Sequence, residues 1–250
     1  MTNVKRIGEA HLVINVIDLT KRTICLVLPG GGYQLLSNRE SGPVATKLNM
    51  LGYNTAILYY SCKPRVPLEE GLDALKELSK DYDNIIVFGF SAGGHLASLL
   101  ATEKEKYNLK AAVLAYPVIS LLEYTHEDTA RNFLGSNLSK EERIKYSSQY
   151  RVSSDAVPCF IWTTKDDELV PFENTVMMKN SLDKEGIKNK VIIFEHGVHG
   201  LALADVTAVV NGDNDTYNRP DIAKWINEAD SFIKEVINEK RWKNGRKEEK

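Results

Sequence analysis

The sequence predicts an α/β fold in which a mostly parallel, twisted sheet is covered by helices on both faces. Short apolar runs rich in β-branched residues alternate along the chain with longer amphipathic stretches. Several of these runs are apolar without interruption, which is typical of strands that are buried on both faces. The 250 residues are enough to build one such core.

Strands and helices are expected in regular alternation along the chain. The expected strands are residues 23–28, 54–60, 85–88, 111–119, 160–164 and 191–195, with 11–17 as an edge strand. The expected helices are residues 42–51 and 67–80, the stretch after residue 91, and a last helix that begins at Pro220. The longer helices carry apolar residues at helical spacing, so each can cover one face of the sheet. We therefore predict one domain over residues 1–240, followed by a charged C-terminal tail over 241–250.

Residues 120–152 break this alternation. They fall between two expected strands and carry several large apolar side chains, followed by a charged helix at residues 139–145. An insertion at this place predicts a small cap over a site built on the strand ends. A plain crossover between the two strands is the alternative.

The composition excludes several classes of function. With 32 basic and 34 acidic residues, the chain has a formal charge of −2 and no basic stripe, so no nucleic-acid partner is expected. The longest apolar stretch, residues 111–122, is too short to cross a bilayer, so no membrane partner is expected. The first residues lack the apolar core of a secretion signal, and the three cysteines form no C-x-x-C pair. We expect a cytoplasmic location with reduced thiols, and a homodimer as the usual default.

One apolar run ends directly in Gly89-Phe90-Ser91-Ala92-Gly93. A buried strand followed by G-x-S-x-G and a helix is typical of a nucleophilic serine on a tight turn. Glycine is expected at positions 89 and 93, because a side chain there would collide with neighbouring backbone. The helix that follows directs its N–H groups at the serine, which favours developing negative charge. An ordinary serine in a Gly-rich turn is the alternative, and the order of the elements around it argues against that.

A serine nucleophile needs a neighbouring base, and the base needs an orienting carboxylate. Candidates for both follow later strands, in the order serine, acid, histidine. The acid is expected in the loop that opens with Asp166, Asp167 and Glu168 and ends at Pro171. The residues alone leave the choice among these three open.

Two histidines compete for the role of the base. His196 follows its strand directly and would be held by packing, whereas His199 lies between Gly197 and Gly200 in a loop that can swing over the serine. We therefore predict His199 as the base. A zinc site at the two histidines lacks a third ligand at a usual spacing, so no metal is expected. His95, in the helix after the elbow, is expected to make structural hydrogen bonds.

The strand over residues 23–28 runs into Pro29 and three glycines. Backbone N–H groups of such a run can face an oxyanion with no side chain in the way. We expect these donors at Gly31 and Gly32, together with the N–H of Ala92. The run lacks the spacing of a phosphate-binding loop, so no cofactor is expected.

Together these motifs resemble those of the acetyl-xylan-esterase-like carbohydrate esterases of the α/β-hydrolase superfamily, and above all the small bacterial acetylesterases often called sugar hydrolases. The resemblance covers most of the chain. It rests on Pro29–Tyr33 with Ser37, Arg39, Glu40 and Pro43; Tyr60, Ser61 and Pro64; Gly89–His95; Tyr116–Ile119; Asp166–Pro171; and His196–Ala202. It implies the α/β-hydrolase fold, with the mostly parallel sheet and the small cap.

The resemblance also implies the roles of the site residues. It makes Ser91 the nucleophile, Asp167 the acid and His199 the base. One departure is the Thr163-Thr164-Lys165 segment, where relatives often have His-Thr-Ala. Lys165 is therefore expected to bring a positive charge close to Asp167.

The activity that follows is that of a carboxylic-ester hydrolase, an acetylesterase-like serine hydrolase that forms a covalent acyl-enzyme and needs no cofactor. Its expected substrates are short acyl esters, acetyl first, of sugars. The short insertion favours small acyl groups, with Tyr33, Leu35, Tyr124 and Phe133 as expected pocket walls. The alternatives are a thioesterase, an amidase or peptidase on the same fold, and a non-catalytic binding protein.

Overall fold

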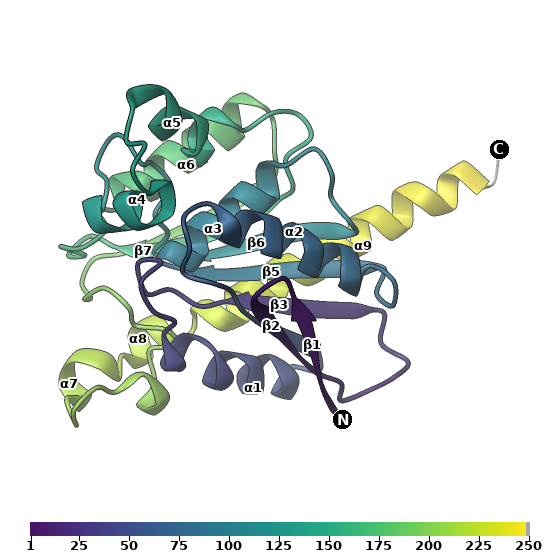
Figure 1. Cartoon of the computed structure of the whole chain (residues 1–250). Coiled ribbons are helices and arrows are strands. Elements are labelled where there is room, and N and C mark those ends of the chain that lie inside the picture. Colours follow the sequence, from purple (N-terminus) through teal and green to yellow (C-terminus); the bar gives the residue numbers. More distant parts are fainter. Residues whose placement is uncertain (249–250) are drawn as a thin grey trace.

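A computed structural model describes the backbone of residues 1–248 and the side chains of residues 1–238. Within this part of the chain, the centre is an eight-stranded sheet in the order β1-β2-β4-β3-β5-β6-β7-β8 (Figure 1). Its strands are β1 (Thr2–Ile7), β2 (Ala10–Asn15), β3 (Thr23–Leu28), β4 (Asn54–Tyr59), β5 (Asn84–Phe90), β6 (Leu109–Ala115), β7 (Cys159–Thr164) and β8 (Asn189–Phe194). The fold class predicted from the sequence is confirmed.

The sheet has a parallel body and an antiparallel edge. Strands β3 to β8 pair in parallel, whereas β1 and β2 run antiparallel beside β4. The sequence-based expectation of an edge strand at 11–17 is wrong, because β2 pairs on both sides and β1 forms the edge. The polar sequence of β1, TNVKRI, lies mostly exposed. Strand β1 therefore has no apolar run that would predict it from the sequence.

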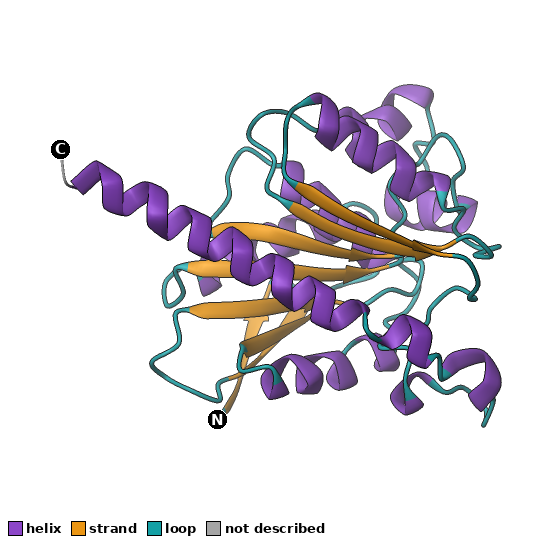
Figure 2. Ribbon diagram, turned by 180° about the vertical axis from the view of Figure 1, so that it is seen from behind, coloured by secondary structure: helices purple, strands orange, loops and turns teal. Residues whose placement is uncertain are grey.

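Helices cover both faces of the sheet (Figure 2). Helices α1 (Gly42–Met50) and α9 (Trp225–Glu248) pack on one face, and α2 (Val66–Leu78), α3 (Ala92–Thr102) and α6 (Glu173–Lys184) on the other. On the first face, Trp225 stacks on Trp162 of β7 with ring centres 5.2 Å apart. The helix expected from Pro220 is divided into α8 (Pro220–Ala223) and α9. The expected tail over 241–250 overlaps the end of α9, and residues 249–250 lie outside the described backbone.

The chain between β6 and β7 folds over the carboxyl ends of the parallel strands, where the candidate site residues gather. It forms α4 (Glu127–Leu134), α5 (Lys140–Lys145) and η2 (Ser148–Tyr150), labelled in part in Figure 1. The amide of Asn132 in α4 donates to the carbonyl of Gly32, which lies just after β3, over 2.8 Å. The expected strand 111–119 ends early, because Tyr116 turns the chain out of the sheet at a φ of 37°.

Two expectations from composition concern the chain as a whole. No helix in the described part of the chain is long and apolar enough to span a membrane. Cys25 and Cys159 are buried, Cys62 is half-buried, and all three are free thiols.

Candidate active site

Ser91 lies on the turn between β5 and α3. Its backbone is held at φ 52° and ψ −116°, outside the regions that L-residues usually adopt. A Cβ on Gly89 would lie 2.3 Å from the carbonyl oxygen of Gly93, and one on Gly93 would lie 2.1 Å from that of Leu28. Both glycines are therefore required where the sequence predicts them, because the elbow leaves no room for a side chain.

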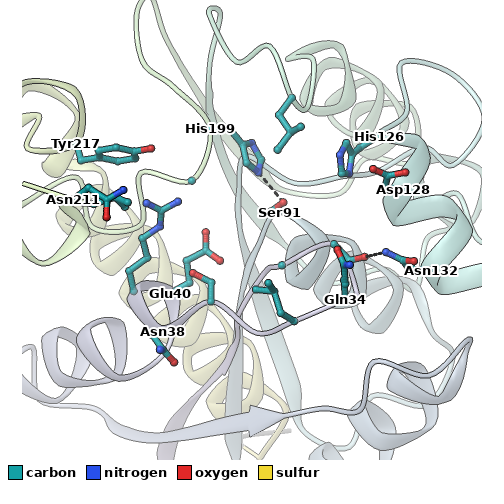
Figure 3. A pocket seen from close by; sticks show the side chains of 18 of the residues that line it. Gln34, Asn38, Glu40, Ser91, His126, Asp128, Asn132, His199, Asn211 and Tyr217 are labelled. Atoms are coloured by element: carbon teal, nitrogen blue, oxygen red, sulfur yellow. Dashed lines mark hydrogen bonds between the residues drawn. The ribbon is translucent and has the colours of Figure 1, made fainter. Parts of the chain in front are cut away.

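The three candidates for the catalytic residues form one chain of hydrogen bonds. The Oγ of Ser91 lies 2.8 Å from Nε2 of His199, and Nδ1 of His199 lies 2.6 Å from Oδ2 of Asp167 (Figure 3). The other oxygen of Asp167 accepts the backbone N–H groups of Leu169 and Val170 at 3.0 and 2.8 Å. An ionised Asp167 accepts from Nδ1–H, which leaves Nε2 free to accept the serine proton.

The competing acids and bases face elsewhere. Asp166 pairs with His196 over 2.8 Å, and both side chains are more than half exposed. Lys165 forms an ion pair with Glu195 over 2.7 Å. Glu168 is exposed.

The loop that carries His199 is held by hydrogen bonds at both ends. The hydroxyl of Thr164 donates to the carbonyl of Gly197 over 2.7 Å, and the N–H of Ala202 donates to the Tyr116 hydroxyl over 2.9 Å. The Tyr116 ring also packs edge-on against His199, with ring centres 5.0 Å apart. These contacts position the His199 ring beside Ser91.

The expected oxyanion donors lie on two segments beside Ser91. Gly31 and Gly32 line the same cavity as the serine, at φ values of 126° and 64°. A Cβ on Gly31 would lie 2.1 Å from the carbonyl oxygen of Leu35, so only glycine fits this turn. Ala92 is the first residue of α3, where a backbone N–H has no partner within the helix.

A buried carboxylate, Glu40, fixes this loop. Its two oxygens accept the N–H of Gly30 at 2.8 Å and the hydroxyl of Tyr116 at 2.7 Å. Burial, and then the Glu40 charge, raises the pKa of Tyr116, so the phenol stays a neutral donor. The sequence offered Glu40 and Tyr116 only as parts of the family motifs, with no role assigned. Together they connect the glycine loop, β6 and the histidine loop.

His95 lies fully buried beneath the site. Its Nδ1 lies 2.9 Å from the Tyr33 hydroxyl, and its Nε2 lies 2.7 Å from the carbonyl oxygen of Tyr146. Burial lowers the pKa of His95 to about 4, which the hydrogen bond to Tyr146 only partly opposes. Its role as a structural hydrogen-bonder matches the expectation, and the bond partners join the glycine loop to the cap.

The cavity at Ser91 has a volume of about 740 Å³ and only one of the four expected pocket walls, Leu35, lines it. Tyr33 and Phe133 are buried around His95, because the positive φ of Tyr33 turns its ring into the core. Tyr124 is exposed and lies outside the lining.

Many of the residues that line this cavity are polar, and the sequence analysis gave none of them a role in it. One end carries His126, Asp128 and Asn132 from the cap, and the other carries Asn38 of η1 (Asn38–Glu40), Asn211, and Tyr217 of α7 (Asn214–Tyr217) (Figure 3). The guanidinium of Arg39, also of η1, lies over the Tyr217 ring. These polar residues come from three segments that are far apart in the chain, so no local sequence pattern predicts that they lie together. Among the described residues, no group of three His, Cys, Asp or Glu side chains is placed to hold a metal ion.

Comparisons with known proteins agree with this geometry. Residues 68–231 match the prolyl oligopeptidase family. The chain is 32% identical to "Endo-1,4-beta-xylanase B" of Butyrivibrio fibrisolvens and 30% identical to "Acetylxylan esterase" of Xylanibacter ruminicola, over 75% and 78% of its length. It spans only 34% and 44% of those two proteins.

Solved structures extend the similarity to nearly the whole chain. The acetyl ester-xyloside bifunctional hydrolase from Caldicellulosiruptor lactoaceticus superposes with a TM-score of 0.80 at 33% identity, covering 91% of this chain and 88% of that one. An α/β-hydrolase enzyme from a deep-sea metagenome library is 30% identical over 95% of this chain and 98% of its own, with a TM-score of 0.78. The chain therefore belongs to the prolyl oligopeptidase family and has the α/β-hydrolase fold.

Proposed function

We propose that this protein hydrolyses short acyl esters of sugars by acyl transfer through Ser91. The observation that carries the proposal is the unbroken hydrogen-bond chain from Ser91 through His199 to Asp167. Among many possible uses of the fold, this arrangement serves one chemistry, the activation of a hydroxyl for attack on a carbonyl.

The mechanism follows from the directions of these bonds. His199 takes the proton of Ser91 through Nε2 as the hydroxyl attacks the ester carbonyl, while Asp167 stabilises the imidazolium. The N–H groups of Gly31, Gly32 and Ala92 hold the oxyanion of the tetrahedral intermediate. Nε2 then returns the proton to the leaving alcohol, and water hydrolyses the acyl-enzyme by the same steps.

Two features support a short acyl group and a hydroxyl-rich alcohol. The aliphatic side chains that line the cavity are Leu35, Leu169, Val209 and Val210, and the large rings of Tyr33 and Phe133 are buried in the core instead of lining it. The polar side chains at the two ends suit hydroxyl groups. The relatives named for acetylxylan and acetyl ester-xyloside point to the same substrate class.

The first test compares p-nitrophenyl acetate with the octanoate ester, for the wild type and for Ser91→Ala. We expect faster hydrolysis of the acetate, and a loss of turnover on the order of 10⁶ in the variant, because the nucleophile is gone. Ser136→Ala, at an exposed serine of the cap, is the matched control. Activity that survives Ser91→Ala refutes the proposed nucleophile, and a maximum at eight carbons refutes the short acyl group.

The family name raises an amide substrate as the competing outcome. An alanine p-nitroanilide, assayed beside the acetate ester, distinguishes the two. Faster cleavage of the anilide would favour a peptidase, whereas we expect the ester to be the better substrate by several orders of magnitude in kcat/KM.

A further inference from the structure

Arg39 is the one lysine or arginine among the residues that line the Ser91 cavity. It belongs to η1, the short helix after the glycine loop. Its Nη2 lies 2.6 Å from the position that a Cβ on Gly200 would occupy, so the guanidinium lies beside the residue that follows His199. A permanent positive charge therefore lies next to the base, inside the cavity that receives the substrate.

This guanidinium has no carboxylate partner within the described part of the chain, where no ion pair to Arg39 is formed. Its Nη1 is buried and makes no hydrogen bond to the protein. The neighbouring carboxylate, Glu40, is turned away and binds Gly30 and Tyr116. The side chain as a whole is half-buried and lines the cavity, so an acceptor that enters the cavity can bind its remaining N–H groups.

The side chain is also held in place before any ligand binds. Its guanidinium carbon lies 5.0 Å from the centre of the Tyr217 ring, a cation–π contact, and Gly200 leaves room for it only because it lacks a Cβ. A guanidinium that is already fixed loses little side-chain entropy when it binds two oxygens.

The position of Arg39 assigns it to the alcohol half of an ester. Nε2 of His199 must return its proton to the leaving oxygen, so the alcohol lies on the histidine side of Ser91. Gly200 and Arg39 are on that side, whereas Gly31 and Gly32 hold the carbonyl oxygen. Figure 3 shows Asn38, Asn211 and Tyr217 at the same end of the cavity, with side chains that hydrogen-bond no other described residue.

We propose, on the basis of the function proposed above, that Arg39 selects esters whose alcohol half carries a carboxylate, such as an O-acetylated uronic acid. The planar fork of N–H donors matches the two oxygens of a carboxylate, and such charge-assisted pairs are the strongest hydrogen bonds that a protein forms. Asn38 and Asn211 then bind ring hydroxyls, which a neutral sugar would also offer.

The test uses two substrates that differ only in the charged group, an O-acetylated glucuronic acid and the glucose ester acetylated at the same position. For the wild type, kcat/KM should be about 10- to 100-fold higher for the uronate. In Arg39→Gln this ratio should fall to near one, mainly through a higher KM for the uronate. Arg39→Lys should keep part of the preference, because the charge remains while the fork is lost.

Arg131→Gln is the matched control. Arg131 is exposed on α4 near the same cavity, pairs weakly with Asp128 at 3.9 Å, and does not line the cavity. If Arg39 acts by direct contact, the ratio stays unchanged in this variant. If the kcat/KM ratio fell as far in Arg131→Gln as in Arg39→Gln, any positive charge near the cavity would produce the preference, and the proposal would be overturned.

A second measurement needs no variant. Free glucuronate should inhibit hydrolysis of p-nitrophenyl acetate by the wild type at concentrations at least about 10-fold lower than free glucose. Equal inhibition by the two free sugars would overturn the role of Arg39. Equal hydrolysis of the two acetylated sugars would do the same, and activity on p-nitrophenyl acetate would show that the proposed esterase function still holds. Hydrolysis of no ester at all overturns the proposed function itself.

Discussion

Asp166 and Asp167 are adjacent in the chain, yet each carboxylate faces a different histidine. Asp167 is buried and bonded to His199 at 2.6 Å, whereas Asp166 is half exposed and bonded to the exposed His196. Both pairs have the geometry of a carboxylate that orients an imidazole. Only one of them reaches the serine, so the two pairs form a natural comparison within one molecule.

Asp167→Asn should lower kcat about 10³- to 10⁴-fold, because an amide no longer stabilises the imidazolium or fixes its tautomer. Asp166→Asn should leave kcat within a few fold. Steady-state hydrolysis of p-nitrophenyl acetate measures both, with circular dichroism to show that each variant folds. Comparable losses in the two variants would contradict the assignment of the acid.

Single site residues can be predicted from the sequence where the proposed chemistry fixes their order along the chain and the residues beside them. Ser91 follows from the glycines that its turn requires, and His199 from its place after the last strand. The choice of Asp167 needed the family pattern, because side-chain direction within a loop is not encoded locally. Tyr33 was misplaced for the same reason, since its φ of 55° decides which side of the turn its ring occupies.

At the scale of elements, the contact between α3 and β3 is made through backbone. Gly93 of α3 lies against the carbonyl oxygen of Leu28, the last residue of β3. A methyl group at this position would lie 2.1 Å from that oxygen, far inside van der Waals contact. The helix can therefore not carry a side chain here without moving away from the sheet.

Gly93→Ala should lower the free energy of unfolding by about 3 kcal/mol or more, because α3 must shift and take Ser91 with it. Gly42→Ala is the control: nothing lies within 4 Å of its added Cβ, so a change within about 0.5 kcal/mol is expected. Urea unfolding at pH 7 measures both. Equal stability of the two variants would show that the elbow tolerates a side chain.

Elements with a strong apolar pattern were predicted well, and those without one were missed or misjudged. The strands at 23–28 and 160–164 and the helix at 42–51 fall within one residue of β3, β7 and α1. Strand β1 is stabilised by pairing rather than by apolar burial, so its sequence carries no period to detect. The early end of β6 depends on the conformation of one residue, Tyr116.

At the scale of the molecule, His95 couples folding to pH. Its pKa is about 4 in the folded protein, against an ordinary value of 6.5. Between these values the unfolded chain binds a proton that the folded chain does not, so stability rises with pH. The contribution of His95 is complete above pH 6.5 and is lost as the pH falls toward 4.

From pH 7 to pH 5 this single histidine should cost about 2 kcal/mol of unfolding free energy. His95→Gln should be less stable at pH 7, because the bonds to Tyr33 and Tyr146 change, yet lose less on acidification. Urea unfolding at pH 7 and pH 5 gives the change of the unfolding free energy with pH. The control is His11→Gln, because His11 is exposed. The same slope in His95→Gln and in the wild type would refute the linkage.

The overall architecture follows from the alternation of strands and helices, but the cavity does not. Most of its lining residues lie in segments 34–40, 126–132 and 209–217, which are far apart in the chain. The polar residues in these segments, Arg39 included, do not belong to an apolar periodicity that would predict a helix or a strand. Their function becomes visible only once distances between distant segments are known.

The order of the site residues along the chain has a consequence for folding kinetics. Ser91 follows a central strand, whereas His199 follows β8, which lies at one edge of the sheet. On the mechanism proposed above, a refolding molecule that has completed only its central strands cannot yet hydrolyse an ester, because His199 reaches Ser91 only when β8 docks. The return of hydrolysis during refolding therefore times the docking of β8, while far-ultraviolet circular dichroism reports the rest of the sheet.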